Sequence, residues 1–194
     1  MVNLNRVATY ALLILTAILK WNQKHSHLIK HTESTDISVC LFKNAHAHKT
    51  MKGIAAFGHS GKGIFYGLKM HITTDLKRQM LTVKFSAGNV PDKEMFIPLN
   101  KDLLGLFVAD AGYIGKKLAR DFYQEGKRIL IAKPRKNMKK LMTKFEEQLY
   151  GTRMLIELNF RNLKLFYGLL SSLPRSVNGY LAHYIYSLLA YHVA

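Results

Sequence analysis

Cysteine is almost absent from this sequence, and acidic residues are scarce. The single cysteine, Cys40, excludes an intramolecular disulfide and any zinc site built from several cysteines. The chain therefore needs no oxidising compartment, and the cytoplasm is the default location. Acidic residues number 12 against 29 lysines and arginines, which gives a formal net charge of +17. Such an excess exceeds what solubility requires and favours a polyanionic partner.

A hydrophobic run long enough to cross a bilayer is also missing. The most apolar stretch is residues 7–19, shorter than the roughly 20 residues that span a membrane. It follows Arg6 as a signal-peptide core would, but Lys20 and Lys24 close it and no small-residue cleavage site follows. We therefore expect a buried or partner-packed helix. Because the basic residues are spread through mixed strand and helix patterns, nucleic acid is favoured over a membrane as the partner.

The chain reads as one α/β domain. Its 194 residues, 48% hydrophobic and 21% charged, suit a single globular unit with a sizeable core. We expect a helix from Asp92, which would cap it, to about Asn100, another after Gly115, and an apolar helix over residues 177–194. Runs rich in β-branched or alternating residues predict strands at 33–42, 64–74, 78–86, 106–110 and 128–133.

Two local patterns suggest sites that their surroundings do not support. His46 and His48 form a His-x-His pair that could ligate zinc, but no carboxylate or thiol lies at a matching spacing. Residues 58–63 hold a Gly-Lys pair, yet Lys62 lacks a following Ser or Thr and no glycine stands five residues before Gly61. We interpret this second stretch as a turn with one basic residue.

Asp110 ends an apolar run that is followed by a glycine turn and a helical pattern. In α/β sheets, ligands bind at the carboxyl ends of strands, so Asp110 is a candidate metal ligand. The alternative is that Asp110 only caps the helix that follows.

Residues 150–164 contain the most informative pattern. Wound as one α-helix, they place four polar side chains on one face and an apolar stripe on the other. The polar set is Tyr150, Arg153, Glu157 and Lys164. From spacing alone, Arg153 and Glu157 could equally be an ordinary surface pair one helical turn apart.

The spacing Tyr-x2-Arg-x3-Glu-x6-Lys resembles the C-terminal signature of bacterial insertion-sequence transposases of the DDE class. The resemblance covers roughly residues 33–194 and implies a ribonuclease H-like fold, a mixed sheet flanked by helices, in which three carboxylates hold Mg²⁺ or Mn²⁺. The other segments that carry it are Lys52-Gly-Ile, Phe65-Tyr-Gly-Leu-Lys-Met-His71, Gly88-Asn-Val, Ala109-Asp-Ala-Gly-Tyr113, Arg135-Lys-Asn137 and Pro174-Arg-Ser-Val-Asn178.

By this resemblance, the catalytic metal ligands are Glu33, Asp110 and Glu157. The family carries Asp where this chain has Glu33, so the carboxylate is kept but its reach is one methylene longer. A displaced ligand oxygen would weaken a site whose two metals lie about 3.5–4 Å apart. Asp36 is the alternative first ligand. Side chains three apart on a strand point to opposite faces, so Glu33 and Asp36 are not expected to serve the same site.

The resemblance also implies DNA contacts from the polar face of the helix. Tyr150, Arg153 and Lys164 would contact phosphates or an extruded base beside the scissile bond. Arg135 and Lys136 belong to a charge run that precedes the helix and suits the DNA backbone.

The implied function is that of a transposase in the bacterial cytoplasm, associated with the nucleoid. It would bind transposon ends and target DNA, with a homodimer on DNA and no membrane partner. Relatives carry a longer region before the first catalytic strand, so residues 1–32 are expected to be the helical remnant of an N-terminally truncated copy, and residues 33–194 the catalytic domain. Two alternatives stay open: a non-catalytic DNA-binding remnant, and a general ribonuclease H-like nuclease, which would leave the polar face unexplained.

Overall fold

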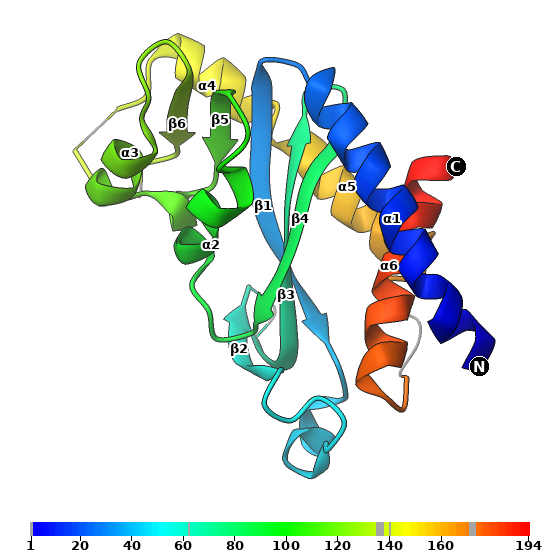
Figure 1. Ribbon diagram of the computed structural model, residues 1–194. Coiled ribbons are helices and arrows are strands. Elements are labelled where there is room, and N and C mark those ends of the chain that lie inside the picture. Colours follow the sequence, from blue (N-terminus) through cyan, green and yellow to red (C-terminus); the bar gives the residue numbers. More distant parts are fainter. Residues whose placement is uncertain (1, 62, 135–137, 140, 171–173) are drawn as a thin grey trace.

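A mixed β-sheet with helices on both faces forms the body of the protein (Figure 1). The computed structural model describes residues 2–61, 63–134, 138–139, 141–170 and 174–194. The six strands of the sheet are β1 (Ile29–Ser38), β2 (Ala56–Ser60), β3 (Gly63–Asp75), β4 (Met80–Ala87), β5 (Gly105–Ala109) and β6 (Arg128–Ala132).

The strand order is that of a ribonuclease H-like sheet. Central strand β1 pairs antiparallel with β3 on one side and parallel with β5 on the other. β5 continues in parallel to β6, while β3 pairs antiparallel with β4 and, near its start, with β2. An antiparallel meander followed by two parallel strands confirms the predicted α/β class and its mixed sheet.

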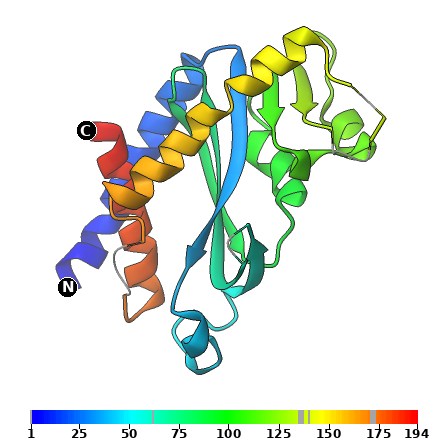
Figure 2. The same cartoon turned by 180° about the vertical axis from the view of Figure 1, so that it is seen from behind.

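Helices cover the two faces unequally. Helices α4 and α5 cross one face, α4 beside β5 and β6 and α5 over β1 (Figure 2), while α1 and α2 lie on the other. The α-helices are α1 (Val2–Lys24), α2 (Asp92–Asn100), α3 (Lys116–Phe122), α4 (Lys144–Gly151), α5 (Met154–Leu165) and α6 (Val177–Val193), and the 3-10 helices are η1 (Phe42–Ala47) and η2 (Ala111–Tyr113).

Helix α1 contains the apolar run at residues 7–19. It packs against α6 and β4 through one face, where Ala8, Ala11 and Leu15 are buried. Its other face leaves Tyr10 and Leu13 exposed. Among the residues that the structure describes, no helix is both long and apolar enough to span a membrane.

The main core lies between the sheet and helices α1, α5 and α6. Leu15 of α1, Ile156 of α5 and Tyr184 of α6 belong to the same buried cluster as Met70 and Ile72 of β3. Burial of such large apolar side chains is the main favourable term in folding. The sheet is therefore fixed from both sides, and α5 is held in a defined position over β1.

The first strand begins four residues earlier than predicted, at Ile29 instead of residue 33, and ends at Ser38. Lys30, His31 and Thr32 are buried although all three are polar, because β1 is a central strand with neighbours on both sides. The Lys30 ammonium donates to a backbone carbonyl, and Thr32 shares a hydrogen bond with Thr73. Residues 32 and 33, where the predicted domain division falls, are consecutive within this strand.

Two further local predictions were wrong. Part of the expected turn at residues 58–63 is strand, because Ala56–Ser60 forms β2 and pairs with the start of β3. The helix expected at residue 92 is present as α2, but Pro91 occupies its N-cap position. Asp92 instead pairs with Lys69 of β3, with 3.0 Å between its carboxylate and the ammonium.

Candidate active site

The three predicted carboxylates come from three elements that meet beside β1. Glu33 lies on β1, and Asp110 follows the last residue of β5. Thr32 pairs with Ala109 across these two parallel strands, so Glu33 and Asp110 each follow a paired position. Glu157 lies in the first turn of α5, which crosses this side of the sheet (Figure 2).

Arg153 joins two of these carboxylates. Its Nη1 forms an ion pair with Oε2 of Glu33, and its Nη2 lies 2.6 Å from Oε1 of Glu157. The side chains of Arg153 and Glu33 are each 17% exposed, while that of Glu157 is 56% exposed. This arrangement differs from the ordinary surface pair that spacing alone allowed, because Arg153 also bonds a half-buried carboxylate from a distant strand.

Tyr150 links the third carboxylate to the same group. Its hydroxyl donates to Oδ1 of Asp110 over 3.3 Å, and the guanidinium of Arg153 lies 5.5 Å from the centre of its ring. The ammonium of Lys133 lies 5.0 Å from that ring centre. The same oxygen of Asp110 accepts a 2.7 Å hydrogen bond from the backbone of Ala111, so Asp110 also caps η2. Asp110 therefore caps η2 and also contacts Tyr150.

The pKa of Glu33 reflects its burial and the nearby charged side chains. Burial, with the charges of Asp110 and Glu157 added to it, raises the pKa of Glu33 to about 7, while Arg153 opposes the shift. Burial disfavours a carboxylate, and nearby negative charge disfavours it further. The site concentrates negative charge, which an added cation would relieve.

The stretch from residue 150 to residue 164 is not one helix, contrary to the sequence prediction. It divides into α4 and α5 at Thr152 and Arg153, where backbone hydrogen bonds span three residues instead of four. Gly151 has low helix propensity, and the Thr152 hydroxyl donates to the carbonyl of Leu149. The break tightens the chain so that Tyr150 and Arg153 face the carboxylates.

His31 and Thr152 position this break, and sequence reasoning missed both. Nε2 of His31 lies 2.8 Å from the Thr152 hydroxyl oxygen. Because that hydroxyl donates to Leu149, its oxygen is left to accept from the imidazole N–H. Burial lowers the pKa of His31 to about 4, so the ring is neutral at physiological pH. In the sequence, His31 lies between polar residues, and no local pattern indicates its contact with Thr152.

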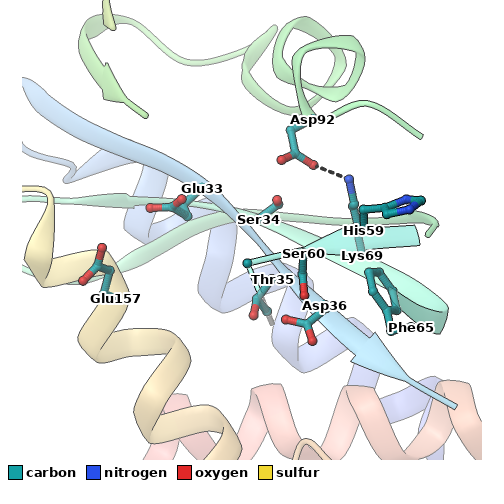
Figure 3. Close-up of a pocket in the computed structure, with 11 residues that line it drawn as sticks. Glu33, Ser34, Thr35, Asp36, His59, Ser60, Phe65, Lys69, Asp92 and Glu157 are labelled. Carbon is teal, nitrogen blue, oxygen red and sulfur yellow. Dashed lines mark hydrogen bonds and ion pairs between the residues drawn. The ribbon is translucent and has the colours of Figure 1, made fainter. Parts of the chain in front are cut away.

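Asp36 lies on β1, three residues after Glu33. Its carboxylate pairs with Lys164 of α5 over 3.4 Å. Glu33 pairs with Arg153 at the start of α5 and Asp36 pairs with Lys164 within it, so the prediction that their side chains serve opposite faces was wrong. Both residues also line a pocket of about 490 Å³ (Figure 3). Twist along β1 (Figure 1) rotates successive side chains away from strict alternation between the two faces.

A family model described as a transposase DDE domain matches residues 23–176. The chain belongs to this transposase family. The match starts within α1 and ends before α6. No curated protein sequence matches this chain.

One solved structure is similar to this chain, the cryo-EM structure of a piggyBac transposase synaptic complex with hairpin DNA. The two chains share 13% sequence identity, with a TM-score of 0.49. The similarity covers 87% of this chain and 48% of the other, so the chain spans about half the length of that transposase.

DDE transposase domains generally use divalent metal ions, and the donors here suit one. Carboxylate oxygens are the ligands that Mg²⁺ and Mn²⁺ prefer. Among the described residues, however, no three His, Cys, Asp or Glu side chains are gathered as a ready metal site. The Arg153 guanidinium instead lies between Glu33 and Glu157. The carboxylate oxygens are therefore suitable ligands for a divalent ion, but Arg153 is bonded to two of the three carboxylates.

The predicted DNA-contacting residues lie in different places. Tyr150 and Arg153 belong to the carboxylate cluster, and Lys164 lies three turns along α5 beside Asp36. Arg135 and Lys136 lie outside the residues that the structure describes.

Proposed function

We propose that this transposase domain acts on the DNA of a bacterial insertion sequence, cutting a phosphodiester with water and joining the freed 3′ hydroxyl to target DNA. The proposal is supported by the contacts that link three carboxylates from separate elements: Arg153 bonds Glu33 and Glu157, and Tyr150, beside Arg153, bonds Asp110. The Tyr-x2-Arg-x3-Glu-x6-Lys spacing supports the insertion-sequence type.

The three carboxylates would hold Mg²⁺ or Mn²⁺, which would supply nucleophile activation and stabilisation of the leaving oxygen. The chain's own residues bind and orient the DNA. Lys133, near the ring of Tyr150, and Lys164 on α5, beside Asp36, would add positive charge for this binding. Positive groups fixed beside a reacting phosphate also stabilise the charge that develops on its oxygens. Residues 33–194 would carry the chemistry, with α1 as packing support.

DNA is the partner that this chemistry requires. The net charge of +17 would make affinity strongly dependent on phosphate contacts and therefore on salt. We propose transposon ends and target DNA as the two substrates, bound by a homodimer. Contacts from Arg135 and Lys136 to the DNA backbone remain part of this proposal.

The test is cleavage of a duplex that carries the terminal repeat flanking the coding sequence. Glu157→Gln removes one negative ligand and should abolish Mg²⁺-dependent nicking while leaving most DNA affinity intact. Glu147→Gln makes the same chemical change at an exposed position of α4 and serves as the matched control. Nicking should survive in this control.

Unchanged nicking by the Glu157→Gln protein would remove Glu157 from the metal site. Equal loss in both variants would point to a general effect on the helices. Loss of DNA binding together with nicking would make Glu157 a structural residue.

A second candidate is a non-catalytic DNA-binding protein that interferes with an intact transposase by co-assembly. The observation in its favour is Glu33, which replaces the Asp of the family and is paired with Arg153. Its DNA affinity would fall steeply with salt whether or not metal is present. Metal-dependent nicking by the unmodified chain would exclude this candidate.

A further inference from the structure

Arg153 occupies the position in which a metal ion would be expected to balance the carboxylates. Its two terminal nitrogens bond two different carboxylates, one from β1 and one from α5. Its planar group also lies near the ring of Tyr150, whose hydroxyl donates to Asp110. One cation thus contacts two of the three proposed ligands directly and reaches the third through a tyrosine.

The position is unusual for an arginine. Arg153 is the N-cap residue of α5, where the positive end of the helix dipole disfavours a cation. No side-chain hydrogen bond caps this helix end. Its side chain is only 17% exposed, so the ion pair with Glu33 is not a solvated surface contact of small effect. The helix dipole does not favour a guanidinium at this position. Its ion pairs with Glu33 and Glu157 therefore explain why it lies there.

We propose that Arg153 is an exchangeable counterion, which neutralises Glu33 and Glu157 in the metal-free site and moves to a DNA phosphate when a divalent cation binds. The inference rests on the proposed function, since it requires these carboxylates to be the metal ligands. It adds a change of partner for Arg153 that couples metal binding to DNA binding.

The exchange follows from geometry and charge. A divalent ion needs oxygens at about 2.0–2.6 Å, and carboxylate oxygens bonded to a guanidinium are not free to approach it that closely. Two cations at one cluster also repel each other. Once released, the planar fork of Arg153 matches a phosphate group as well as it matches a carboxylate. Arg153 is thus the group through which occupation of the metal site would increase DNA affinity, and by reciprocity DNA would increase metal affinity.

Lys164 provides a matched comparison on the same helix. Its side chain is also 17% exposed and also pairs with a carboxylate of β1, Asp36. Its ion pair is with Asp36, which is not one of the three proposed ligands. Removing the charge of Lys164 lowers the net charge of the protein by one, as does removing the charge of Arg153. Arg153, in contrast, is bonded to two of the proposed ligands.

The deciding experiment is calorimetric titration of the full chain with MgCl₂, in the absence of DNA. Arg153→Met keeps much of the side-chain volume over Tyr150 but removes the charge and both bonds. It should bind Mg²⁺ about tenfold more tightly than the unmodified chain, because charge-assisted bonds no longer compete. Arg153→Lys keeps the charge but loses the two-pronged geometry, and an intermediate affinity is expected. Lys164→Met should bind Mg²⁺ within about twofold of the unmodified chain.

Several results would overturn the exchange. Equal Mg²⁺ affinity in the Arg153→Met and unmodified proteins would mean that Arg153 does not compete. Equal gains in Arg153→Met and Lys164→Met would reduce the effect to net charge. If Arg153→Met unfolds, Arg153→Lys still decides, because unchanged affinity in that variant refutes the role of the two-pronged contact. Absence of Mg²⁺ binding in all variants would refute the proposed function itself.

DNA affinity gives an independent readout. Binding of a duplex is measured with Ca²⁺, as a divalent ion chosen to separate binding from cleavage, and with EDTA. The gain in affinity on adding Ca²⁺ should be severalfold in the unmodified chain and clearly smaller in Arg153→Met. An equal gain in both proteins would contradict the movement of Arg153 to phosphate.

Discussion

The imidazole of His31 and the hydroxyl of Thr152 lie 2.8 Å apart, joining the central strand β1 to the break between α4 and α5. Arg153 directly follows this break, and Tyr150 directly precedes Gly151. The contact therefore sets where the guanidinium and the phenol lie relative to Glu33. The contribution of this hydrogen bond to stability can be measured with variants of the two residues.

Replacement of Thr152 by Val should destabilise the protein by about 1–3 kcal/mol, because a buried imidazole N–H loses its acceptor. The free energy of unfolding from urea titration measures the effect. His31→Phe removes the other partner, and the double variant should lose less than the two single losses combined. Simple additivity would show that the two side chains do not interact.

His71 should make the protein sensitive to acid. This ring is fully buried against Ser86, and burial lowers its pKa to about 4. The unfolded chain takes up the proton near pH 6.5, so stability is full above that pH and falls as the pH drops towards 4. The loss from this group amounts to at most about 3 kcal/mol.

In the His71→Gln protein, the slope of unfolding free energy between pH 6.5 and pH 4 should be clearly reduced relative to the unmodified chain. Urea titrations at several pH values provide the comparison. Parallel slopes in the two proteins would show that His71 takes no part in the acid sensitivity.

Mg²⁺ affinity should depend on the protonation of Glu33. Burial, more than its charged neighbours, raises the pKa of this group to about 7, and a ligand must lose its proton to bind metal. Affinity should therefore be full above pH 7 and fall as the pH is lowered to 6. Calorimetric titrations at pH 8 and pH 6 test this. The slope should flatten in Glu33→Gln, and an unchanged slope there would assign the proton to another group.

Restoration of the family's residue by Glu33→Asp should increase Mg²⁺-dependent cleavage. The shorter side chain provides the reach expected of the first ligand and gives up part of the contact with Arg153. Misplacement of a reacting group by about 1 Å can cost 10²-fold, so a gain of about tenfold is expected. Cleavage of the terminal-repeat duplex measures it. An unchanged rate would place the limiting step outside Glu33.

Strands β3 and β4 could be predicted from sequence to within two residues at each end. Their β-branched and alternating residues carry a signal that survives without tertiary information. β1 could not be placed as well, because Lys30 and His31 are polar residues whose burial depends on partners elsewhere in the chain. β2 was missed because five residues with a central glycine resemble a turn.

The candidate site was predictable as a set of residues and not as an arrangement. Spacing and resemblance selected Glu33, Asp110 and Glu157, and these approach one another only through the fold. The break at Thr152 depends on a hydroxyl that bonds both Leu149 and His31, which no local pattern reveals. The pairing of Arg153 with Glu33 joins residues 120 positions apart, so helical periodicity could not anticipate it.

The most direct test of the central claim is the location of a bound metal by anomalous scattering from crystals grown with Mn²⁺. We predict a manganese peak with oxygens of Glu33, Asp110 and Glu157 at about 2.0–2.6 Å, and the guanidinium of Arg153 withdrawn from Glu33. Manganese bound elsewhere, or held at Asp36 with Arg153 still joined to both carboxylates, would contradict it.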